Sequence, residues 1–228
     1  MTKKTTLDPV NKSLVELERS IGRQRLGIMN NQVWHQDPKR LVFTLARYKF
    51  VAKILSGKAR VAEVGCGDGF AARIVKQEVE HLLISDVDPL FIENFENPED
   101  QSPAWSIQSI VHNILEKPLP SPKYDAVYSL DVLEHISSSQ EDVFLKNLCK
   151  SLIPQGIGII GMPSLESQKY ASPPSKAGHI NCKTGEDLSE LMKNFFHNVF
   201  LFSMNDEVVH TGFSKMAHYL IAVGCGKR

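Results

Sequence analysis

The sequence predicts an α/β fold with a mostly parallel sheet, and two features of the chain lead to this class. From residue 60 onward, short apolar runs alternate with longer stretches of helical periodicity, which is the pattern of parallel strands joined by crossover helices. A glycine-rich turn follows the first apolar run, as it does where a parallel strand leads directly into a helix. At 228 residues the chain is long enough for one such domain and too short for two of ordinary size.

The amino-terminal part of the chain is predicted to be helical. From Leu7 to about Asn30 it is polar with sparse apolar positions, which predicts a surface helix followed by a turn containing Gly and Asn. Asp37 and Pro38 predict the start of a second helix, because Asp can cap a helix and Pro fits its first turn. Gly57 ends that helix.

Seven segments of the remaining chain have the length and apolar content of strands. Helices are expected after the first, second, fourth and fifth of them. The predicted strands are Arg60–Val64, Leu82–Ser85, Ser106–Val111, Tyr124–Leu130, Gly156–Met162, Val199–Met204 and Ala217–Val223, and the best-defined helices are Gln140–Leu152 and Gly185–Phe196.

The connection Pro163–Gly178 differs from the other connections. It is rich in Ser, Pro and Lys, it is longer than an ordinary loop, and it follows the fifth predicted strand directly. Long connections beside a site often carry function, so we expect this one to be a lid that is mobile without ligand.

The composition excludes several classes of partner. Lys plus Arg and Asp plus Glu are equal at 26 each, which removes the long-range positive field that attracts nucleic acid. No apolar run approaches the roughly 18 residues of a membrane helix, and the start Met1-Thr-Lys-Lys-Thr-Thr precedes no signal-peptide core. The four cysteines are scattered, with no C-x-x-C pair, which predicts reduced packing thiols. We therefore expect a cytoplasmic protein that binds neither nucleic acid nor membrane.

The segment Val61–Phe70 carries the strongest chemical signal in the sequence. Gly65, Gly67 and Gly69 lie where a strand ends and a helix begins, so the backbone can approach a ligand closely. The dinucleotide fingerprint requires G-x-G-x-x-G, and the position of its third glycine is Phe70 here. A nicotinamide enzyme is therefore disfavoured, and a glycine-rich turn without a ligand is the purely structural alternative.

This segment, with Glu63 two places before the first glycine, closely resembles the first motif of the class I S-adenosylmethionine-dependent methyltransferases. The likeness continues for most of the chain. It implies a Rossmann-like three-layer α/β/α sandwich with a seven-stranded, mostly parallel sheet whose last strand is antiparallel. We expect residues 1–58 to form a helical extension covering the active site and residues 59–228 to form the methyltransferase domain.

The resemblance also implies the cofactor, S-adenosylmethionine, and contacts to it. The glycine turn packs against the amino-acid part of the cofactor in this family, and the strand-borne carboxylate positions the turn and the cofactor's ammonium group. The residues that inherit these roles are Glu63, Gly65, Cys66, Gly67 and Gly69.

Asp86, at the end of the second predicted strand, is the implied ribose ligand. A carboxylate there can accept two hydrogen bonds from a ribose diol, as in dinucleotide-binding folds. Asp88 precedes Pro89 at a helix start and is better explained as a helix cap.

Asn113 and Ile114 follow the third strand, where many relatives place an Asp that holds the adenine amino group. An amide oxygen can accept the same hydrogen bond, although an ordinary turn Asn explains the residue almost as well. Similar enzymes place an arginine upstream of the glycine turn to meet the cofactor's carboxylate, which favours Arg47 for that role. An exposed helix arginine is the alternative.

The segment Tyr124–Ile136 resembles the fourth motif of the family, and its V-L-E-H ending is common in ubiquinone-biosynthesis O-methyltransferases. The resemblance implies that the backbone at Leu130 borders the cofactor and that Asp131 and His135 face the acceptor chamber. Enzymes that methylate amino groups of nucleic-acid bases usually carry an N-P-P-Y-like tetrapeptide at this point, and Ser129-Leu130-Asp131-Val132 is nothing like it.

Two histidines are candidate general bases. His135 follows a strand end, and the near-neutral intrinsic pKa of histidine suits removal of a proton from a hydroxyl acceptor. His179 follows the expected lid, where related enzymes often bring a histidine near the acceptor. A capping or packing role is the structural alternative for His135.

The sequence predicts no required metal. Catechol-type enzymes join an Asp after the fourth strand to an Asp-Asn pair after the fifth, and Met162-Pro163-Ser164 supplies no such pair. Asp131, Glu134 and His135 alone form a poor, closely spaced ligand set for a hard cation.

The functional hypothesis is methyl transfer to an oxygen or nitrogen of a small metabolite, for example a sugar or a nucleotide- or phosphate-bearing precursor. Lys169, Tyr170, Lys176 and His179 motivate an anionic acceptor, although a solvated loop explains the lysines as well. A quinone-precursor phenol is the second hypothesis, and a methyltransferase-like binding protein without catalysis is the third. A homodimer is a possible assembly.

Overall fold

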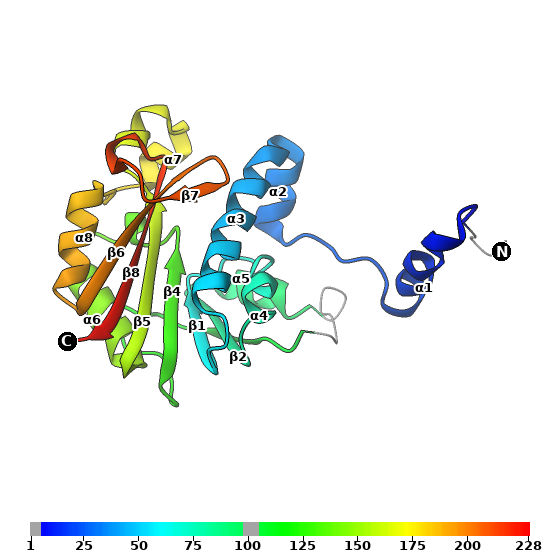
Figure 1. Cartoon of the computed structure of the whole chain (residues 1–228), viewed down its shortest axis with the longest axis horizontal. Helices are drawn as coiled ribbons and strands as arrows, with labels where there is room; N and C mark the ends of the chain where they lie inside the picture. The colour runs from blue at the N-terminus through cyan, green and yellow to red at the C-terminus, as the bar shows by residue number, and fades with distance from the viewer. Residues whose placement is uncertain (1–5, 98–104) are drawn as a thin grey trace.

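The computed structural model describes residues 6–97 and 105–228, so most of the segment Met1-Thr-Lys-Lys-Thr-Thr lies outside the described residues. The fold is the predicted three-layer α/β/α sandwich around a single sheet (Figure 1). The strands are β1 Arg60–Val64, β2 His81–Asp86, β3 Gln108–Val111, β4 Tyr124–Leu130, β5 Leu152–Pro163, β6 Phe196–Asn205, β7 Val208–His210 and β8 Tyr219–Lys227.

The sheet has the order β3-β2-β1-β4-β5-β8-β6-β7. Strands β1 to β5 pair in parallel, and β8 lies antiparallel between β5 and β6, which confirms the predicted direction of the last strand. The predicted number of seven strands is wrong, because a short eighth strand, β7, pairs with β6 as a hairpin. Asp206 in the turn has φ 51°, a conformation that Asp tolerates better than most residues.

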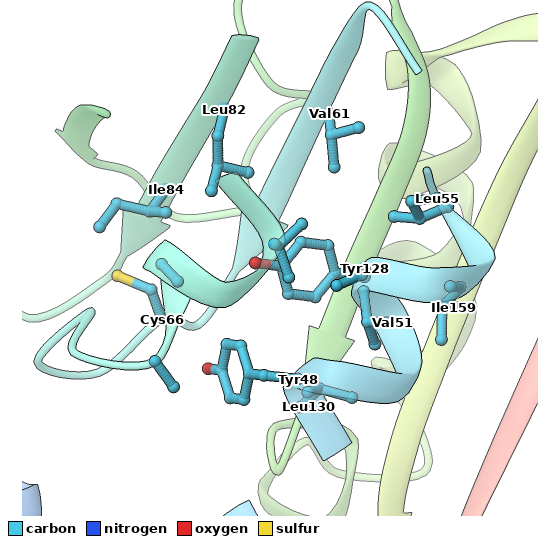
Figure 2. Packing of buried hydrophobic residues seen from close by; sticks show 14 of the residues in the cluster. Tyr48, Val51, Leu55, Val61, Cys66, Leu82, Ile84, Tyr128, Leu130 and Ile159 are labelled. Atoms are coloured by element: carbon cyan, nitrogen blue, oxygen red, sulfur yellow. The ribbon is translucent and has the colours of Figure 1, made fainter. Parts of the chain in front are cut away.

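The helices are α1 Lys12–Ile21, α2 Ile28–Gln36, α3 Pro38–Ile54, α4 Ala72–Lys76, α5 Pro89–Phe95, α6 Glu141–Ser151, α7 Pro173–Gly178 and α8 Gly185–Lys193. Short 3₁₀ helices are η1 Pro9–Asn11, η2 Leu133–His135, η3 Glu166–Tyr170 and η4 Ser214–Met216. One apolar cluster joins α3, α4 and α5 to one face of the sheet, and a second joins α6 and α8 to the other face. Figure 2 shows Tyr48 and Val51 of α3, and Leu55 directly after it, packed on the first face.

The amino-terminal segment agrees with the sequence prediction only in part. Helix α1 is the predicted surface helix: it has no buried residue and stands apart from the sheet in Figure 1. The predicted turn is present only in part: residues 22–27, which include Gly22 and Gly27, are irregular, but Asn30 lies inside α2. The reason is a tertiary contact, since Asp68 accepts hydrogen bonds from the backbone and the side chain of Asn30. Asp37 stands at the start of α3 as predicted, but its side chain makes no capping hydrogen bond.

The connection Pro163–Gly178 is not a continuous irregular loop, because it contains η3 and α7. The Ser172 side chain accepts a hydrogen bond from the Ser175 backbone, and Pro173 occupies the first turn of α7, so the Ser and Pro residues that suggested a loop start a helix instead. Across the described part of the chain, no helix combines the length and the apolar character needed to cross a bilayer.

Candidate active site

The candidate site lies at one edge of the sheet. Strands β1, β2, β4 and β5 are parallel, so their carboxyl ends meet at that edge. The glycine turn follows β1, Asp86 ends β2, Asp131 follows β4 and Pro163 ends β5. Open α/β sheets bind their ligands at this position.

The glycine turn requires glycine for two reasons. Gly65, Gly67 and Gly69 have φ values of 76°, 53° and 65°, which other residues adopt only with strain. A Cβ atom on Gly65 would lie 2.2 Å from a methyl carbon of Val132, and one on Gly67 would lie 2.7 Å from the sulfur of Met29. The turn is therefore closely packed by side chains from other segments.

Cys66, between the first two glycines, faces inward. Its thiol is buried and donates to the carbonyl oxygen of Gly67 over 3.4 Å. Burial raises the pKa of the Cys66 thiol, and the carboxylates of Glu63 and Asp86 raise it further. The thiol is accordingly a packing group in this structure, as the scattered cysteines predicted.

Asp86 fastens the glycine turn to the end of β2. One carboxylate oxygen accepts a hydrogen bond from Gly67 N at 2.9 Å, and the other accepts one from Asp88 N at 2.9 Å. Each oxygen has a second lone pair, so two further donors can be accommodated. The Asp88 side chain accepts from Leu90 N at the start of α5, which is the expected helix cap.

Glu63 lies directly beneath this turn, and its side chain is fully buried. Its oxygens accept hydrogen bonds from Tyr48 Oη at 2.5 Å and from Tyr128 Oη at 2.8 Å. Burial raises the pKa of Glu63 to about 7, although the two tyrosine hydroxyls act in the opposite direction. The carboxylate that the family resemblance assigned to the cofactor's ammonium group is thus enclosed by two tyrosines.

A residue that sequence reasoning missed, Asp68, connects the turn to helix α2. Its buried carboxylate accepts hydrogen bonds from Asn30 N at 2.9 Å, from Asn30 Nδ2 at 2.7 Å and from Phe70 N at 3.2 Å. Together with the contact between Met29 and Gly67, these bonds hold α2 against the glycine turn. No local pattern signals this role, because the partner lies 38 positions away.

Arg47 is neither exposed nor free. Its Nη1 atom donates to both carboxylate oxygens of Asp131, at 3.0 and 2.8 Å, and its guanidinium lies 3.7 Å from the centre of the Tyr219 ring. Burial acts to lower the pKa of Arg47, but Asp131, Tyr219 and Glu134 together act more strongly in the opposite direction, so the pKa is raised. Asp131 itself has φ 57°, which is unusual for a residue other than glycine. The sequence suggested Arg47 but not its pairing with Asp131 and Tyr219.

The adenine-side candidates form a turn. Asn113 Oδ1 accepts from Leu115 N at 3.0 Å, and Asn113 Nδ2 donates to Glu116 at 3.0 Å. In this structure Asn113 therefore has the hydrogen bonds of an ordinary turn Asn, which was the alternative to an adenine contact. Ile114 is buried, and its carbonyl accepts from Asn147. Leu130 is also buried and packs with the α3 face of the sheet.

The two candidate bases meet. The rings of His135 and His179 lie 5.1 Å apart, edge to face. His135 Nδ1 bonds to the carbonyl oxygen of Gly178 at 2.9 Å, and His179 Nδ1 bonds to Gln168 Oε1 at 3.0 Å. Burial and the neighbouring His135 lower the pKa of His179, so His179 is uncharged at neutral pH.

Glu134 lies beside this pair and is fully buried. Both carboxylate oxygens lack a hydrogen-bond partner among the residues that the structure describes. Burial raises the pKa of Glu134 to about 9, Asp131 adds to the rise, and the Glu134 backbone amide and Arg47 oppose it. The backbone amide of Glu134 favours the charged form of the carboxyl group, although its geometry does not satisfy a hydrogen bond.

A cavity of about 450 Å³ opens next to His179. It lies at the end of β5 and the start of β8, and η3 and α7 border it. The residues that line it are Pro163, Ser167, Gln168, Tyr170, Ala171, Ser175, His179 and His218. Its size is within the range of small-molecule sites.

The part of the chain that forms this edge of the sheet is similar to a known domain family. Residues 62–160 match the family described as "Methyltransferase domain". A curated relative, the ubiquinone biosynthesis O-methyltransferase of Rickettsia bellii, is 25% identical over 139 residues, which are 59% of this chain and 54% of the relative. The chain thus spans about half the length of the curated relatives it matches.

Solved structures of the same fold include two methyltransferases with bound S-adenosylhomocysteine. The N-methyltransferase NodS from Bradyrhizobium japonicum WM9 aligns with a TM-score of 0.61 at 17% identity, over 92% of this chain and 96% of that one. Magnesium protoporphyrin IX methyltransferase from Synechocystis PCC 6803 aligns with a TM-score of 0.58 at 16% identity, over 95% of each chain.

Fold and site together define a protein of the Rossmann-like type with a ligand edge at the strand ends. The matched domain adds to this definition: residues 62–160 are similar to the methyltransferase domain family, and the chain shares its fold with solved methyltransferases.

Proposed function

We propose that this protein binds S-adenosylmethionine at the glycine turn and transfers its methyl group to an oxygen or nitrogen of a small metabolite. The observation that carries the proposal is the hydrogen bond from Gly67 N to the Asp86 carboxylate. It places the glycine turn, whose backbone a ligand can approach closely, next to a carboxylate that can accept hydrogen bonds from a ribose. The matched methyltransferase domain contains both.

The cofactor contacts that we propose surround the hydrogen bond between Gly67 and Asp86. Gly65, Cys66, Gly67 and Gly69 supply backbone, and Asp86 accepts from the ribose. Glu63 supports the turn from below, Asn113 and Ile114 border the adenine, and the Leu130 backbone borders the methionine part. We propose that Arg47 meets the cofactor's carboxylate while it orients Asp131, since Asp131 already occupies its Nη1 donor.

Helix α2 is proposed to cover the cofactor. Met29 packs on Gly67, and Asn30 is held by Asp68, so this part of the amino-terminal extension lies on the glycine turn. A covering helix would exclude water from the reacting sulfonium, which strengthens electrostatic interactions there.

The acceptor is proposed to occupy the cavity beside His179. Transfer is an in-line displacement, in which the acceptor atom attacks the methyl carbon and the sulfur keeps the electron pair of the broken bond. Alignment of the reactants contributes several kcal/mol in such reactions, and a general base adds about two to four orders of magnitude. His179 is the better placed candidate base, because it lines the cavity and the lowered pKa keeps the imidazole uncharged.

Two classes of acceptor are candidates for this cavity. Tyr170 and His179 line the cavity, and Lys169 lies 4.8 Å from the centre of the Tyr170 ring, which supports a sugar or a phosphate-bearing precursor. A quinone-precursor phenol is the second candidate, supported by the V-L-E-H segment and the similarity to the Rickettsia bellii enzyme.

Two measurements test the proposal. Calorimetric titration should show binding of S-adenosylmethionine and S-adenosylhomocysteine and none of nicotinamide dinucleotides. Incubation with methyl-labelled cofactor and a panel of sugars, phosphorylated precursors and phenols should transfer label to one class. Binding of cofactor without transfer to any acceptor would support a binding protein instead, and preference for a dinucleotide would refute the proposal.

A further inference from the structure

Three side chains from two separate segments meet next to the acceptor cavity. Glu134 and His135 belong to η2, and His179 follows α7, yet metal-ligating atoms of all three lie within 4.8 Å of one another. Two imidazoles and one carboxylate suit first-row divalent cations such as Zn²⁺ and Co²⁺. We propose that Glu134, His135 and His179 form a binding site for one such cation.

The state of Glu134 is the first observation that points to a cation. This side chain is fully buried, and neither oxygen has a hydrogen-bond partner among the described residues. A buried carboxyl group without a partner costs free energy, so proteins normally pair it or use it to coordinate a metal. Arg47, whose charge acts on Glu134, donates its hydrogen bonds to Asp131 instead.

The hydrogen bonds of the two histidines are the second observation. Each Nδ1 atom faces a carbonyl oxygen, that of Gly178 for His135 and that of the Gln168 side chain for His179. A carbonyl oxygen only accepts, so Nδ1 carries the proton and Nε2 keeps its lone pair. Metal-binding histidines show this pattern, because the second hydrogen bond fixes the tautomer and the ring orientation.

The two segments are also fixed relative to each other. Asn181 N donates to the Glu134 carbonyl oxygen at 3.0 Å, and Leu165 N donates to the Lys183 carbonyl oxygen at 2.8 Å. The ligands therefore do not need to assemble from a loose loop. The sequence prediction of no metal considered only Asp131, Glu134 and His135 as ligands. The structure brings His179, a residue distant in the sequence, next to Glu134 and His135.

A cation held in this way would deepen the proposed function. Three protein ligands leave a coordination position open, and His179 lines the cavity in which we place the acceptor. A coordinated His179 has no free lone pair, so with a cation bound it would no longer act as the base. A hydroxyl group bound to the cation would instead release its proton to solvent more readily, and its oxygen would then attack the methyl carbon. This role rests on the proposed function, whereas cation binding itself does not.

The test measures binding without any reaction. Chelator-treated protein is titrated with Zn²⁺, and the metal that stays with it through gel filtration is counted; Co²⁺ loading is followed by visible absorption. We expect one equivalent in the wild type and at least about tenfold weaker binding in Glu134→Gln, His135→Ala and His179→Ala. His197→Ala, which removes an exposed histidine from β6, is the matched control and should keep the full equivalent.

Thermal unfolding with and without Zn²⁺ covers the case of a poorly folding variant. Zn²⁺ should raise the midpoint of the wild type and of His197→Ala but not that of His179→Ala. Less than a tenth of an equivalent in the wild type, or full binding by His179→Ala, would overturn the site. S-adenosylmethionine titration of the same metal-free samples separates the two proposals, since retained cofactor binding leaves the proposed function standing.

Discussion

The two ends of the ligand edge are constructed differently. At the β1/β2 end, the proposed cofactor groups come from one short stretch, residues 63–69, and from the last residue of the next strand. At the β4/β5 end, His135 and His179 belong to segments separated by all of α6 and β5, and Arg47 reaches Asp131 from a helix that precedes the sheet. Backbone conformation thus specifies the first end, whereas the second exists only after the fold has formed.

The largest effect that we expect is at the second end. His179→Ala should lower kcat about 10²-fold to 10⁴-fold, because the acceptor loses the group that assists proton removal, while cofactor affinity stays unchanged. Steady-state kinetics and calorimetry measure the two quantities separately. His81→Ala, at the opposite edge of the sheet, serves as the control; a loss of cofactor affinity in His179→Ala would show that the two ends are not separable.

The glycine turn provides the complementary test at the first end. Gly67→Val should weaken cofactor binding by about 3 kcal/mol or more, because the side chain would be strained at positive φ and would collide with Met29. Gly57→Val is the matched control, since Gly57 has φ 78° and open space around it. Calorimetric titration should show normal affinity in the control, and equal losses in both variants would assign the effect to general backbone strain.

Glu63 lies beneath the glycine turn of the first end, and its ionisation should appear in the pH dependence of stability. The folded pKa of about 7 lies above the ordinary value of 4.5 for a glutamate, so the folded state binds the proton more tightly. The contribution to stability is present below about pH 4.5 and is lost as the pH rises toward 7. Between pH 5 and 8 the free energy of unfolding should fall by about 2 to 3 kcal/mol more in the wild type than in Glu63→Gln.

Urea unfolding at several pH values measures this difference. Parallel curves for the wild type and Glu63→Gln would mean that the carboxyl group ionises with its ordinary pKa. Tyr48→Phe should raise the pKa of Glu63 further, because the hydroxyl group of Tyr48 stabilises the charged form.

The smallest expected effect concerns Asp86, which connects the end of β2 to the glycine turn. Asp86→Ala should weaken cofactor binding by about 1–3 kcal/mol, because the ribose hydroxyls lose charge-assisted hydrogen bonds. Asp88→Ala is the control, since this neighbour caps α5 and should affect stability more than affinity. An unchanged dissociation constant in folded Asp86→Ala would move the ribose site elsewhere.

The same contrast explains what the sequence could reveal. Strands β1 and β4 were predicted to the residue, because their apolar runs are bounded by clear turn residues. Asp86 and the glycines follow from their position at strand ends. By contrast, the docking of Asn30 on Asp68 and the pairing of Arg47 with Asp131 depend on contacts 38 and 84 positions apart, and no local pattern encodes them. The short strand β7 was missed because three residues give no periodic signal.

The place of β8 has a consequence for synthesis of the protein. This strand, residues 219–227, lies between β5 and β6, so β6 and β7 have no position in the sheet until it is present. On the ribosome, β1 to β5 can pair as they emerge, whereas β6 must wait for residues that are translated later. An interrupted translation product would therefore expose the edge of β5, a parallel strand with unpaired backbone groups, and would be a target for aggregation or degradation.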